Sequence, residues 1–318
     1  MFILRFDFRL GPQSDTTMAD LYATSLEMAE WGEAHGAMTA LFSEHHSSPD
    51  GYLPSPLVLA AATAARTSTL PINVGALLAL MYDPVKLAED MVVLDHLSKG
   101  RVNYTIGLGY RPEEYAMFGV DPSARGRLMD EHLDVLRRAL TGERFEWRGR
   151  TVHVTPEPYT DGGPMIAYGG GTPAAARRAA RRGMMFLPQH ADPGLAAAYD
   201  AAAEEAGNPP GLCMSPPAGA PTSVFVAHDL DEAWSRLGPH LLHDAQLYRD
   251  WLGDTPSSSL SAASTVEELR AENGAYRIVT PDEARALRAE YGILSLQPLC
   301  GGIHPADAWE CLRLVCEL

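Results

Sequence analysis

The stretch Met165-Ile166-Ala167-Tyr168-Gly169-Gly170-Gly171-Thr172-Pro173 is the most informative part of the chain for its fold. A short apolar run leads into three glycines, followed by Thr172 as an expected N-cap and Pro173 at the first position of a helix. Glycines let a ligand approach the backbone closely, and the unpaired N–H groups of a helix start favour an anion. The loop 169–172 is therefore a candidate phosphate site; the alternative is a well-capped helix after a tight turn.

Strand-like and helix-like segments alternate on both sides of this loop. Continuous apolar strands between amphipathic helices predict a parallel sheet covered by helices. About eight such units predict a closed barrel, an α/β fold of the (β/α)8 TIM type, with a doubly wound open sheet as the alternative. Strands are expected at 2–8, 38–43, 72–81, 102–109, 165–168, 184–187, 223–227, 276–280 and 293–297, helices at 17–35, 56–67, 84–97, 123–141, 173–182, 281–291 and 305–317, and a hairpin at 145–154.

The patterns are weaker in the later part of the chain. Residues 228–274 form a polar excursion, and its serine-rich part, 256–264, is a candidate lid over the mouth of the barrel. The proline-rich stretch 209–221 is interpreted as a surface loop. We therefore expect a single domain over residues 1–318, with one late excursion.

Composition limits the classes of function. The chain has 318 residues, of which 46% are hydrophobic and 21% charged, as in ordinary globular proteins. A formal net charge of −16 argues against a nucleic-acid partner. No apolar run is long enough to span a bilayer, and the four cysteines include no C-x-x-C pair. We expect a cytoplasmic protein with no membrane span, disulfide framework or metal site.

Two histidines follow the second predicted strand, in Glu44-His45-His46. The carboxyl ends of barrel strands form the functional rim, and adjacent side chains on an extended backbone point to opposite sides. At most one histidine is therefore expected to face the mouth of the barrel, where it could act as an acid or a base near neutral pH. The alternative is that both are structural.

Further candidates follow the later strands. Gly107-Leu108-Gly109-Tyr110 leaves room for a flat ligand at the two glycines, and Tyr110 can stack on it or hydrogen-bond to it. Arg125 and Arg127 could bind a phosphate or remain surface charges. The segment 240–244 has two histidines but lacks the H-E-x-x-H pattern, so we interpret it as surface. No dinucleotide fingerprint, nucleophile elbow or Walker loop is present.

An ordered set of motifs carries a family resemblance. It comprises Ser43-Glu44-His45-His46, Asp83-Pro84-Val85-Lys86-Leu87-Ala88-Glu89-Asp90, Leu94-Asp95, Leu97-Ser98-Lys99-Gly100-Arg101-Val102, Phe118-Gly119-Val120-Asp121, Pro156, Tyr159-Thr160-Asp161-Gly162-Gly163 and the loop 169–172. In this order the motifs resemble those of the bacterial luciferase-like flavin-dependent monooxygenases. The resemblance covers residues 1 to about 190 and, more loosely, 280–302.

The resemblance implies a barrel whose mouth holds the isoalloxazine ring of a flavin, with its phosphate near Gly170, Gly171 and Thr172. In the family the third strand often ends in a non-prolyl cis peptide, which would fall near Leu77-Leu78. His45 is similar to the family's active-site histidine, and His46 is its neighbour. The phosphate-binding arginine of luciferase falls near Leu108 here, so Arg125 or Arg127 would replace it.

The resemblance also implies an activity. The family pattern is a monooxygenase that uses reduced FMN and molecular oxygen to hydroxylate or cleave a small organic substrate, here one other than that of a luciferase. A separate flavin reductase would supply the reduced cofactor, because no nicotinamide motif is visible, and relatives often form homodimers. Two alternatives stay open: a deazaflavin-dependent hydride-transfer oxidoreductase and a non-catalytic flavin-binding protein on the same fold.

Overall fold

Nine parallel strands form the central sheet of the computed structural model, which describes all residues from Met1 to Leu318. Their order is β10-β9-β11-β1-β2-β3-β4-β7-β8, and all eight ladders between neighbours are parallel. The strands are β1 Phe2–Phe6, β2 Ala37–Phe42, β3 Ile72–Leu78, β4 Val102–Gly107, β7 Ile166–Gly170, β8 Phe186–Pro188, β9 Ser223–Val226, β10 Tyr276–Val279 and β11 Leu294–Leu296.

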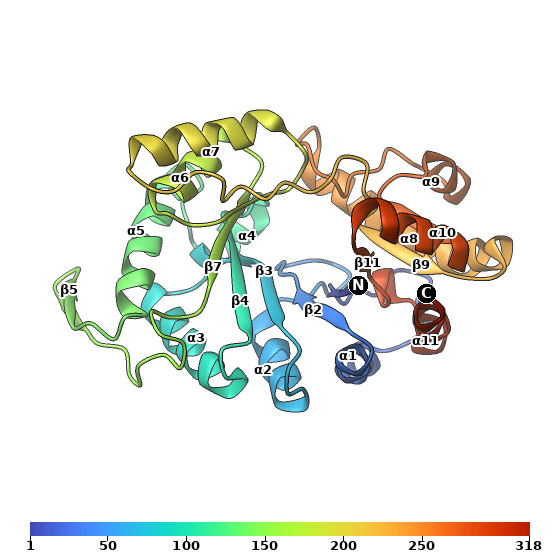
Figure 1. Ribbon diagram of the computed structural model, residues 1–318, viewed down its shortest axis with the longest axis horizontal. Coiled ribbons are helices and arrows are strands. Elements are labelled where there is room, and N and C mark those ends of the chain that lie inside the picture. The colour runs from blue at the N-terminus through green and yellow to red at the C-terminus, as the bar shows by residue number, and fades with distance from the viewer.

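Helices lie outside the curved sheet, as Figure 1 shows. They are α1 Met18–Ala34, α2 Pro56–Arg66, α3 Pro84–Ser98, α4 Pro112–Met117, α5 Arg125–Ala139, α6 Pro173–Arg181, α7 Pro193–Glu205, α8 Leu230–Leu252, α9 Val266–Glu272, α10 Pro281–Tyr291 and α11 Pro305–Leu314. Short 3₁₀ turns occur at Ala79–Met81, Cys300–Gly302 and Val315–Glu317. None of the helices combines the length and the hydropathy needed to cross a membrane.

Local sequence explains why these elements form where they do. In β1, Phe2, Leu4 and Phe6 are buried while the residues between them are half-buried, which is the two-residue period of a strand. Two helices illustrate side-chain caps: Asp83 accepts two backbone N–H groups at the start of α3, and Thr280 forms a capping box at the start of α10. Both caps precede a proline at the first helical position, where its missing N–H costs nothing.

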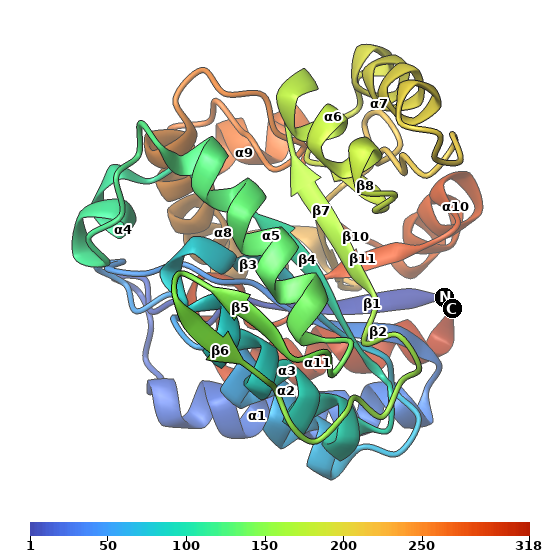
Figure 2. The ribbon, with the colours of Figure 1, turned by 90° about the vertical axis from the view of Figure 1, so that its left-hand side faces the viewer.

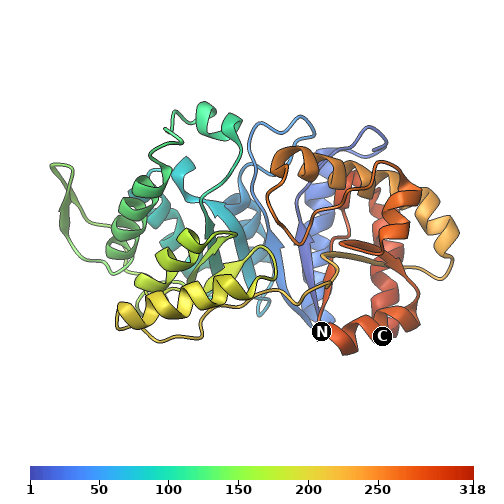
Figure 3. The same cartoon turned by 90° about the horizontal axis from the view of Figure 1, so that it is seen from above.

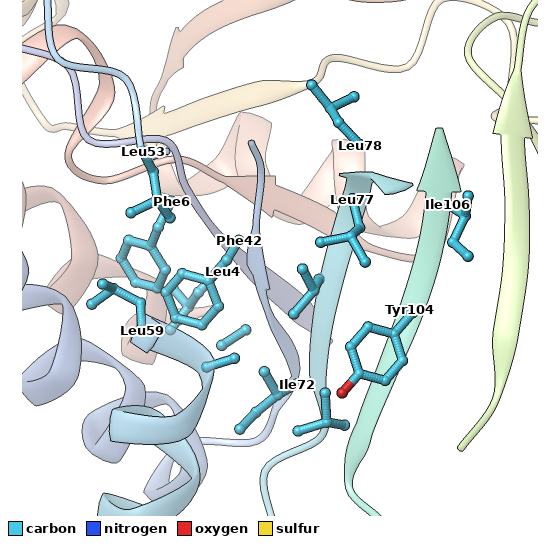
Figure 4. Packing of buried hydrophobic residues seen from close by; sticks show 14 of the residues in the cluster. Leu4, Phe6, Phe42, Leu53, Leu59, Ile72, Leu77, Leu78, Tyr104 and Ile106 are labelled. Carbon is cyan, nitrogen blue, oxygen red and sulfur yellow. The ribbon is translucent and has the colours of Figure 1, made fainter. Parts of the chain in front are cut away.

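The core lies between the first strands and their covering helices. Figure 4 shows Phe6 of β1 and Phe42 of β2 packed beside Leu59 of α2, with Leu77 of β3 nearer to Ile106 of β4. These residues belong to one cluster of 76 buried hydrophobic residues that extends through the whole chain. One continuous core of this kind holds the strand ends in fixed positions, which is what a site at those ends requires.

The small hairpin stands apart from the sheet. Its strands, β5 Phe145–Trp147 and β6 Arg150–Val152, are antiparallel, as expected for residues 145–154. Figure 2 shows the hairpin beside α5, and the indole N–H of Trp147 donates to Glu131 of that helix at 2.9 Å. Seen from above, in Figure 3, the hairpin projects at one end of the molecule and the two chain termini lie close together on one side.

The predicted parallel barrel is confirmed, and the alternative of a doubly wound open sheet is not, because β1 lies between β2 and the last strand, β11. All nine expected strands form the sheet, but some details differ from the prediction. β9 lies between β10 and β11, and no ladder joins β8 to β10. The third strand also ends at Leu78 and continues as a 3₁₀ turn, and the polar excursion 228–274 contains the helices α8 and α9. That residues 1–318 form a single domain stays a prediction.

Candidate active site

Polar side chains gather at the carboxyl ends of the parallel strands. Asp7 and Arg9 follow β1, Glu44-His45-His46 follows β2, Tyr110 to Glu114 follows β4, and the glycine loop ends β7. Because these ends share one edge of a parallel barrel, residues far apart in the sequence meet there. The candidate site is built from this edge.

His45 is held by hydrogen bonds at both ring nitrogens. Its Nδ1 lies 2.7 Å from Oε1 of Glu114, and its Nε2 lies 3.2 Å from the hydroxyl oxygen of Tyr110. The rings of Tyr52 and Trp251 pack against the imidazole, with centroids 4.8 and 4.9 Å away. His45 is buried, so its orientation is fixed by these four neighbours.

Burial lowers the pKa of His45, and the hydrogen bond to Glu114 opposes this effect without cancelling it. The imidazole is therefore neutral at neutral pH. Burial raises the pKa of Glu114, but the hydrogen bonds from His45 and from the backbone N–H of His46 together lower it by more. The carboxyl is therefore ionised. An ionised carboxylate only accepts hydrogen bonds, which assigns the imidazole proton to Nδ1.

His46 has different partners and joins two strand ends. Its Nε2 lies 3.0 Å from Oε1 of Glu44, and its ring lies edge-on to Phe118, 4.7 Å between centroids. Glu44 also accepts the backbone N–H of Leu78 at 2.7 Å and the hydroxyl of Tyr82 at 2.6 Å. Glu44 therefore fixes the end of β3 against the end of β2, a positional role that the histidine motif did not reveal.

Four aromatic rings and two arginines surround His45. Trp251, near the end of α8, has the guanidinium carbon of Arg111 4.2 Å from its ring centroid and that of Arg9 4.7 Å away. Tyr52 and Tyr248 join their hydroxyls at 3.0 Å, and both rings also contact Arg9. Arg111 donates to the carbonyl of His46 at 2.6 Å. Stacked cations and rings of this kind make a rigid wall at the strand ends.

Arg9 is the centre of a buried ionic network that the sequence did not indicate. Its Nε lies 2.8 Å from Asp244 and 3.3 Å from Asp7, and its Nη1 lies 3.2 Å from Asp50. Arg9 is fully buried, and its Nη2 has no hydrogen-bond partner. Burial, and next the charge of Asp244, raise the pKa of Asp7 to about 7. The network is therefore close to gaining or losing a proton near neutral pH.

The segment 240–244, interpreted from the sequence as surface, is largely buried in α8, so that interpretation is wrong for its main members. His240 bonds through Nδ1 to the carbonyl of Gly301 at 2.9 Å, and His243 reaches Asp50 at 3.0 Å. Asp244 is buried and accepts the hydroxyl of Tyr276 at 2.7 Å. The absence of a metalloprotease motif said nothing about burial, which depends on the face that α8 presents to the sheet.

The glycine loop after β7 has the structure expected of it. Thr172 caps α6 by accepting the N–H of Ala175 at 3.2 Å, and the backbone N–H groups of Gly171, Thr172 and Ala174 make no hydrogen bond within the chain. A Cβ at Gly170 would lie 2.7 Å from Ala175, so packing within the chain already requires that glycine. The free N–H groups at a helix start fit an anion such as a phosphate.

The two candidate arginines differ in their surroundings. Both lie exposed in the first turn of α5. The charge of Arg125 acts on the hydroxyl of Tyr115, which donates to the carbonyl of Leu108 at the end of β4. The charge of Arg127 acts instead on the carboxylates of Asp121, which is exposed, and Glu131, which is half-buried. Of the two, Arg125 is thus the one whose charge acts on a side chain bonded at the end of β4.

The remaining candidates lie at the ends of β3 and β4. A non-prolyl cis peptide is present at Gly75–Ala76, so the expected position at Leu77-Leu78 is wrong by two residues. Leu77 and Leu78 are buried, and Figure 4 shows them at the end of β3. At Gly107 a Cβ would lie 2.8 Å from that of Ala76, which places β4 close against the cis peptide. Gly109 has a φ of +81°, a conformation that favours glycine.

The structure thus brings most of the predicted residues to one edge of the barrel. His45 and Tyr110 are in direct contact, whereas Arg125 and the glycine loop lie further along the same edge. Whether they bind or react with a ligand stays a prediction. Sequence patterns did not lead to a prediction of the residues that hold this edge together, namely Asp7, Arg9, Glu44, Asp50, Arg111, Glu114, Asp244, Tyr248 and Trp251. Signals existed for the first two, because paired charges directly after an apolar strand mark its carboxyl end.

Fold and site define an α/β-barrel protein with a polar site at the carboxyl ends of its parallel strands. The chain belongs to the luciferase-like monooxygenase family, whose model matches residues 2–291. It is similar to 4-hydroxyprotoasukamycin monooxygenase of Streptomyces nodosus subsp. asukaensis, with 36% identity over 37% of this chain and 32% of that protein. It is also similar to limonene 1,2-monooxygenase of Rhodococcus erythropolis, with 33% identity over 41% and 36% of the two chains. The chain spans about half or less of the length of these and the other leading curated relatives.

Solved structures match over the whole chain. The monooxygenase RslO1 from Streptomyces bottropensis superposes with a TM-score of 0.78 at 25% identity, covering 100% of this chain and 98% of that one. The oxygenating constituent of 3,6-diketocamphane monooxygenase from Pseudomonas putida, solved with FMN, gives 0.75 at 19% identity over 99% and 96%. An F420-dependent secondary alcohol dehydrogenase gives 0.64 at 17% identity over 99% of each. The last two likenesses concern the fold alone.

Proposed function

We propose that this protein is a flavin-dependent monooxygenase that uses reduced FMN and molecular oxygen on a small organic substrate. The observation that carries the proposal is the position of a neutral, buried His45 and of the free N–H groups after β7 on the same edge of a barrel of this family. Monooxygenases among its relatives support it, as does a protein of the same fold that was solved with FMN.

Each part of the flavin has a fitting region on this edge. The phosphate would lie on the N–H groups of Gly171 and Thr172, with Arg125 as the nearby cation. The ring would lie among the apolar ends of β3 and β4, near Leu78 and Gly109. FMN when bound supplies the oxygen chemistry, while the chain orients the reactants, excludes water and moves protons at His45.

A deazaflavin-dependent hydride-transfer enzyme is the second candidate, because an F420-dependent dehydrogenase shares the fold. Its cofactor also carries a phosphate, so the glycine loop alone does not separate the two. The first proposal includes two partners: a separate flavin reductase that supplies the reduced cofactor, and a second copy of the chain in a homodimer.

The separating experiment measures cofactor binding and oxygen consumption. Purified protein is titrated anaerobically with reduced FMN, reduced riboflavin and reduced F420, and each mixture is then exposed to oxygen. Tight binding of reduced FMN, weaker binding of riboflavin and rapid oxygen uptake are expected. Binding of F420 without oxygen uptake would favour the second candidate, and binding of neither would reject both. His45→Ala tests for a mere flavin carrier, since a carrier would keep its function.

A further inference from the structure

Three side chains form one continuous hydrogen-bonded chain at the proposed site. Glu114 Oε1 lies 2.7 Å from His45 Nδ1, and His45 Nε2 lies 3.2 Å from the hydroxyl of Tyr110. Tyr110 directly follows the loop that ends β4, Glu114 lies in α4, and His45 follows β2. Two strand ends and a helix therefore place a carboxylate, an imidazole and a phenol in sequence.

The polarity of these hydrogen bonds can be assigned. Glu114 is ionised and only accepts, so His45 donates from Nδ1. The neutral imidazole then has a lone pair at Nε2, which accepts the Tyr110 O–H. Burial raises the pKa of Tyr110, so its hydroxyl keeps the proton it donates. All three groups point the same way, from Tyr110 toward Glu114.

Solvent exposure differs between the two ends of this row of hydrogen-bonded side chains. Glu114 and His45 are buried, whereas Tyr110 is partly exposed. A molecule bound at the strand ends therefore meets the phenol before it meets the imidazole. The Tyr110 hydroxyl also keeps a free lone pair, because its one proton points toward His45.

We propose that Tyr110, His45 and Glu114 form a proton relay in which the Tyr110 hydroxyl contacts the bound reactants and Glu114 is a positioning residue for His45. The inference rests on the proposed function. In the relay, an acidic O–H or N–H of the bound reactants gives its proton to the Tyr110 oxygen. Tyr110 passes its own proton to His45 Nε2, and the Nδ1 proton stays in the bond to Glu114. One proton leaves the reactants, one imidazolium forms, and reversal returns both groups to their starting state.

The charges around His45 explain why the relay needs a carboxylate. Arg9 and Arg111 both lower the pKa of His45, as does burial, and so they disfavour an imidazolium. Glu114 opposes all three from 2.7 Å. The charged or titratable groups that face the imidazole are Arg9, Tyr52, Tyr110, Arg111, Glu114 and Tyr248. Of these, Glu114 alone carries a negative charge at neutral pH.

Imidazole NMR of the protein without cofactor tests the bonds of the relay directly. The His45 signal is assigned by its loss in His45→Gln and followed through a pH titration. Glu114→Gln keeps an acceptor but removes the charge, so the pKa of His45 falls. Tyr110→Phe removes the bond that stabilises the neutral ring, so the pKa rises. Shifts of opposite sign are expected; unchanged values, or shifts of the same sign, would overturn the relay.

Tyr248→Phe is the matched control, because its ring faces His45 at 6.4 Å but its hydroxyl bonds to Tyr52 instead. It should leave the pKa of His45 unchanged. A loss of packing around the site would affect this variant as well, whereas a loss of the relay would not.

Reoxidation of reduced FMN on the protein, measured against pH, tests proton movement. We expect Tyr110→Phe to slow the pH-dependent step by about 100-fold when the rate is measured at saturating FMN. Glu114→Gln should move the acidic limb of the profile to lower pH. A profile that neither variant alters would overturn the relay even if FMN binds. If FMN does not bind at all, the proposed function fails, while the NMR result still reports whether the bonds exist.

Discussion

Arg9 illustrates how a single side chain can tie distant parts of a barrel together. Its guanidinium touches carboxylates from the β1 end, the loop after β2 and α8, and it faces three aromatic rings. Taking so much charge out of water is costly, and the arrangement is favourable only while every member is present. The network therefore fixes the end of β1, the loop after β2 and α8 relative to one another, and its members are not independent sources of stability.

Removal of the cation should be strongly destabilising. In Arg9→Met three buried carboxylates lose their partner, and we expect the free energy of unfolding to fall by about 3–5 kcal/mol. Arg66→Ala is the control, since its ion pair with Glu30 is 45% and 40% exposed and should matter by less than about 1 kcal/mol. Equilibrium urea unfolding measures both. Equal losses would show that the Arg9 network is no more important than a surface pair.

Asp7 should also make the free energy of unfolding depend on pH. The pKa of Asp7 is raised from 3.8 to about 7 in the folded state, so the folded protein binds this proton more tightly than the unfolded chain does. The favourable contribution is complete below about pH 4 and is lost as the pH rises through about 7.

Asp7→Asn keeps an oxygen for Gln297 and Arg9 but cannot ionise. Compared with the wild type, its urea midpoint should therefore improve steadily between about pH 4 and about pH 8. The difference between the two midpoints at each pH is the relevant quantity. A constant difference across this range would mean that Asp7 is not the titrating group.

At the scale of elements, α8 contributes most to the site and was hardest to foresee. It brings Asp244, Tyr248 and Trp251 to the strand ends, yet its sequence is polar and Pro239 lies inside it. A signal was present, because Ala233, Leu237, Leu241 and Ala245, all buried, recur every four residues. Proline and the surrounding charges hid this period.

The elements of the first half were predictable because their apolar runs are continuous and their caps are strong. β1 to β4, α3 and α6 fall within a few residues of their predicted bounds. His45 and Tyr110 were identified because they directly follow strands. Glu114 was not, because it lies beyond the loop that follows β4, in the short helix α4, and only the fold shows that α4 returns toward β2.

The start of α5 offers a test of phosphate binding. Since the charge of Arg125 acts on Tyr115, which is bonded at the end of β4, and that of Arg127 acts on Asp121 and Glu131, Arg125→Gln should weaken FMN binding by about tenfold or more, as expected for one charge-assisted hydrogen bond. Arg127→Gln, which removes the other arginine in the first turn of α5, should bind FMN normally. Riboflavin, which lacks the phosphate, should bind all three proteins alike. Fluorescence titration decides, and an equal effect of the two substitutions would exclude a specific role for Arg125.

At the scale of the whole molecule, the sheet has a seam. β8 and β10 end the strand order without pairing to each other, although the family fold is a barrel. Figure 1 shows the chain between β8 and β9 passing across this side of the molecule. The number of strand and helix units predicted a barrel, but the place of the seam could not be predicted, because periodicity specifies strands but not which of them share a ladder.

Hydrogen exchange should reveal the seam. The amides of β10 that face away from β9 lack a ladder partner, whereas β3 is paired on both sides by β2 and β4. We expect alternate amides of Tyr276–Val279 to exchange well before those of Ile72–Leu78. Equal protection of the two strands would show that the ring is closed in solution.

The ionic network around Arg9 has a consequence for folding during synthesis. Gln297 donates to Asp7 from 290 positions further along the sequence, and Asp244 also belongs to the last third of the protein. On the ribosome, Asp7 and Arg9 therefore emerge just after the first strand, before Asp244 and Gln297 have been synthesised. Asp7 and Arg9 can reach their final arrangement only after Asp244 and Gln297 have been synthesised. A polypeptide that ends before these residues would therefore leave the charge of Arg9 without part of its compensation.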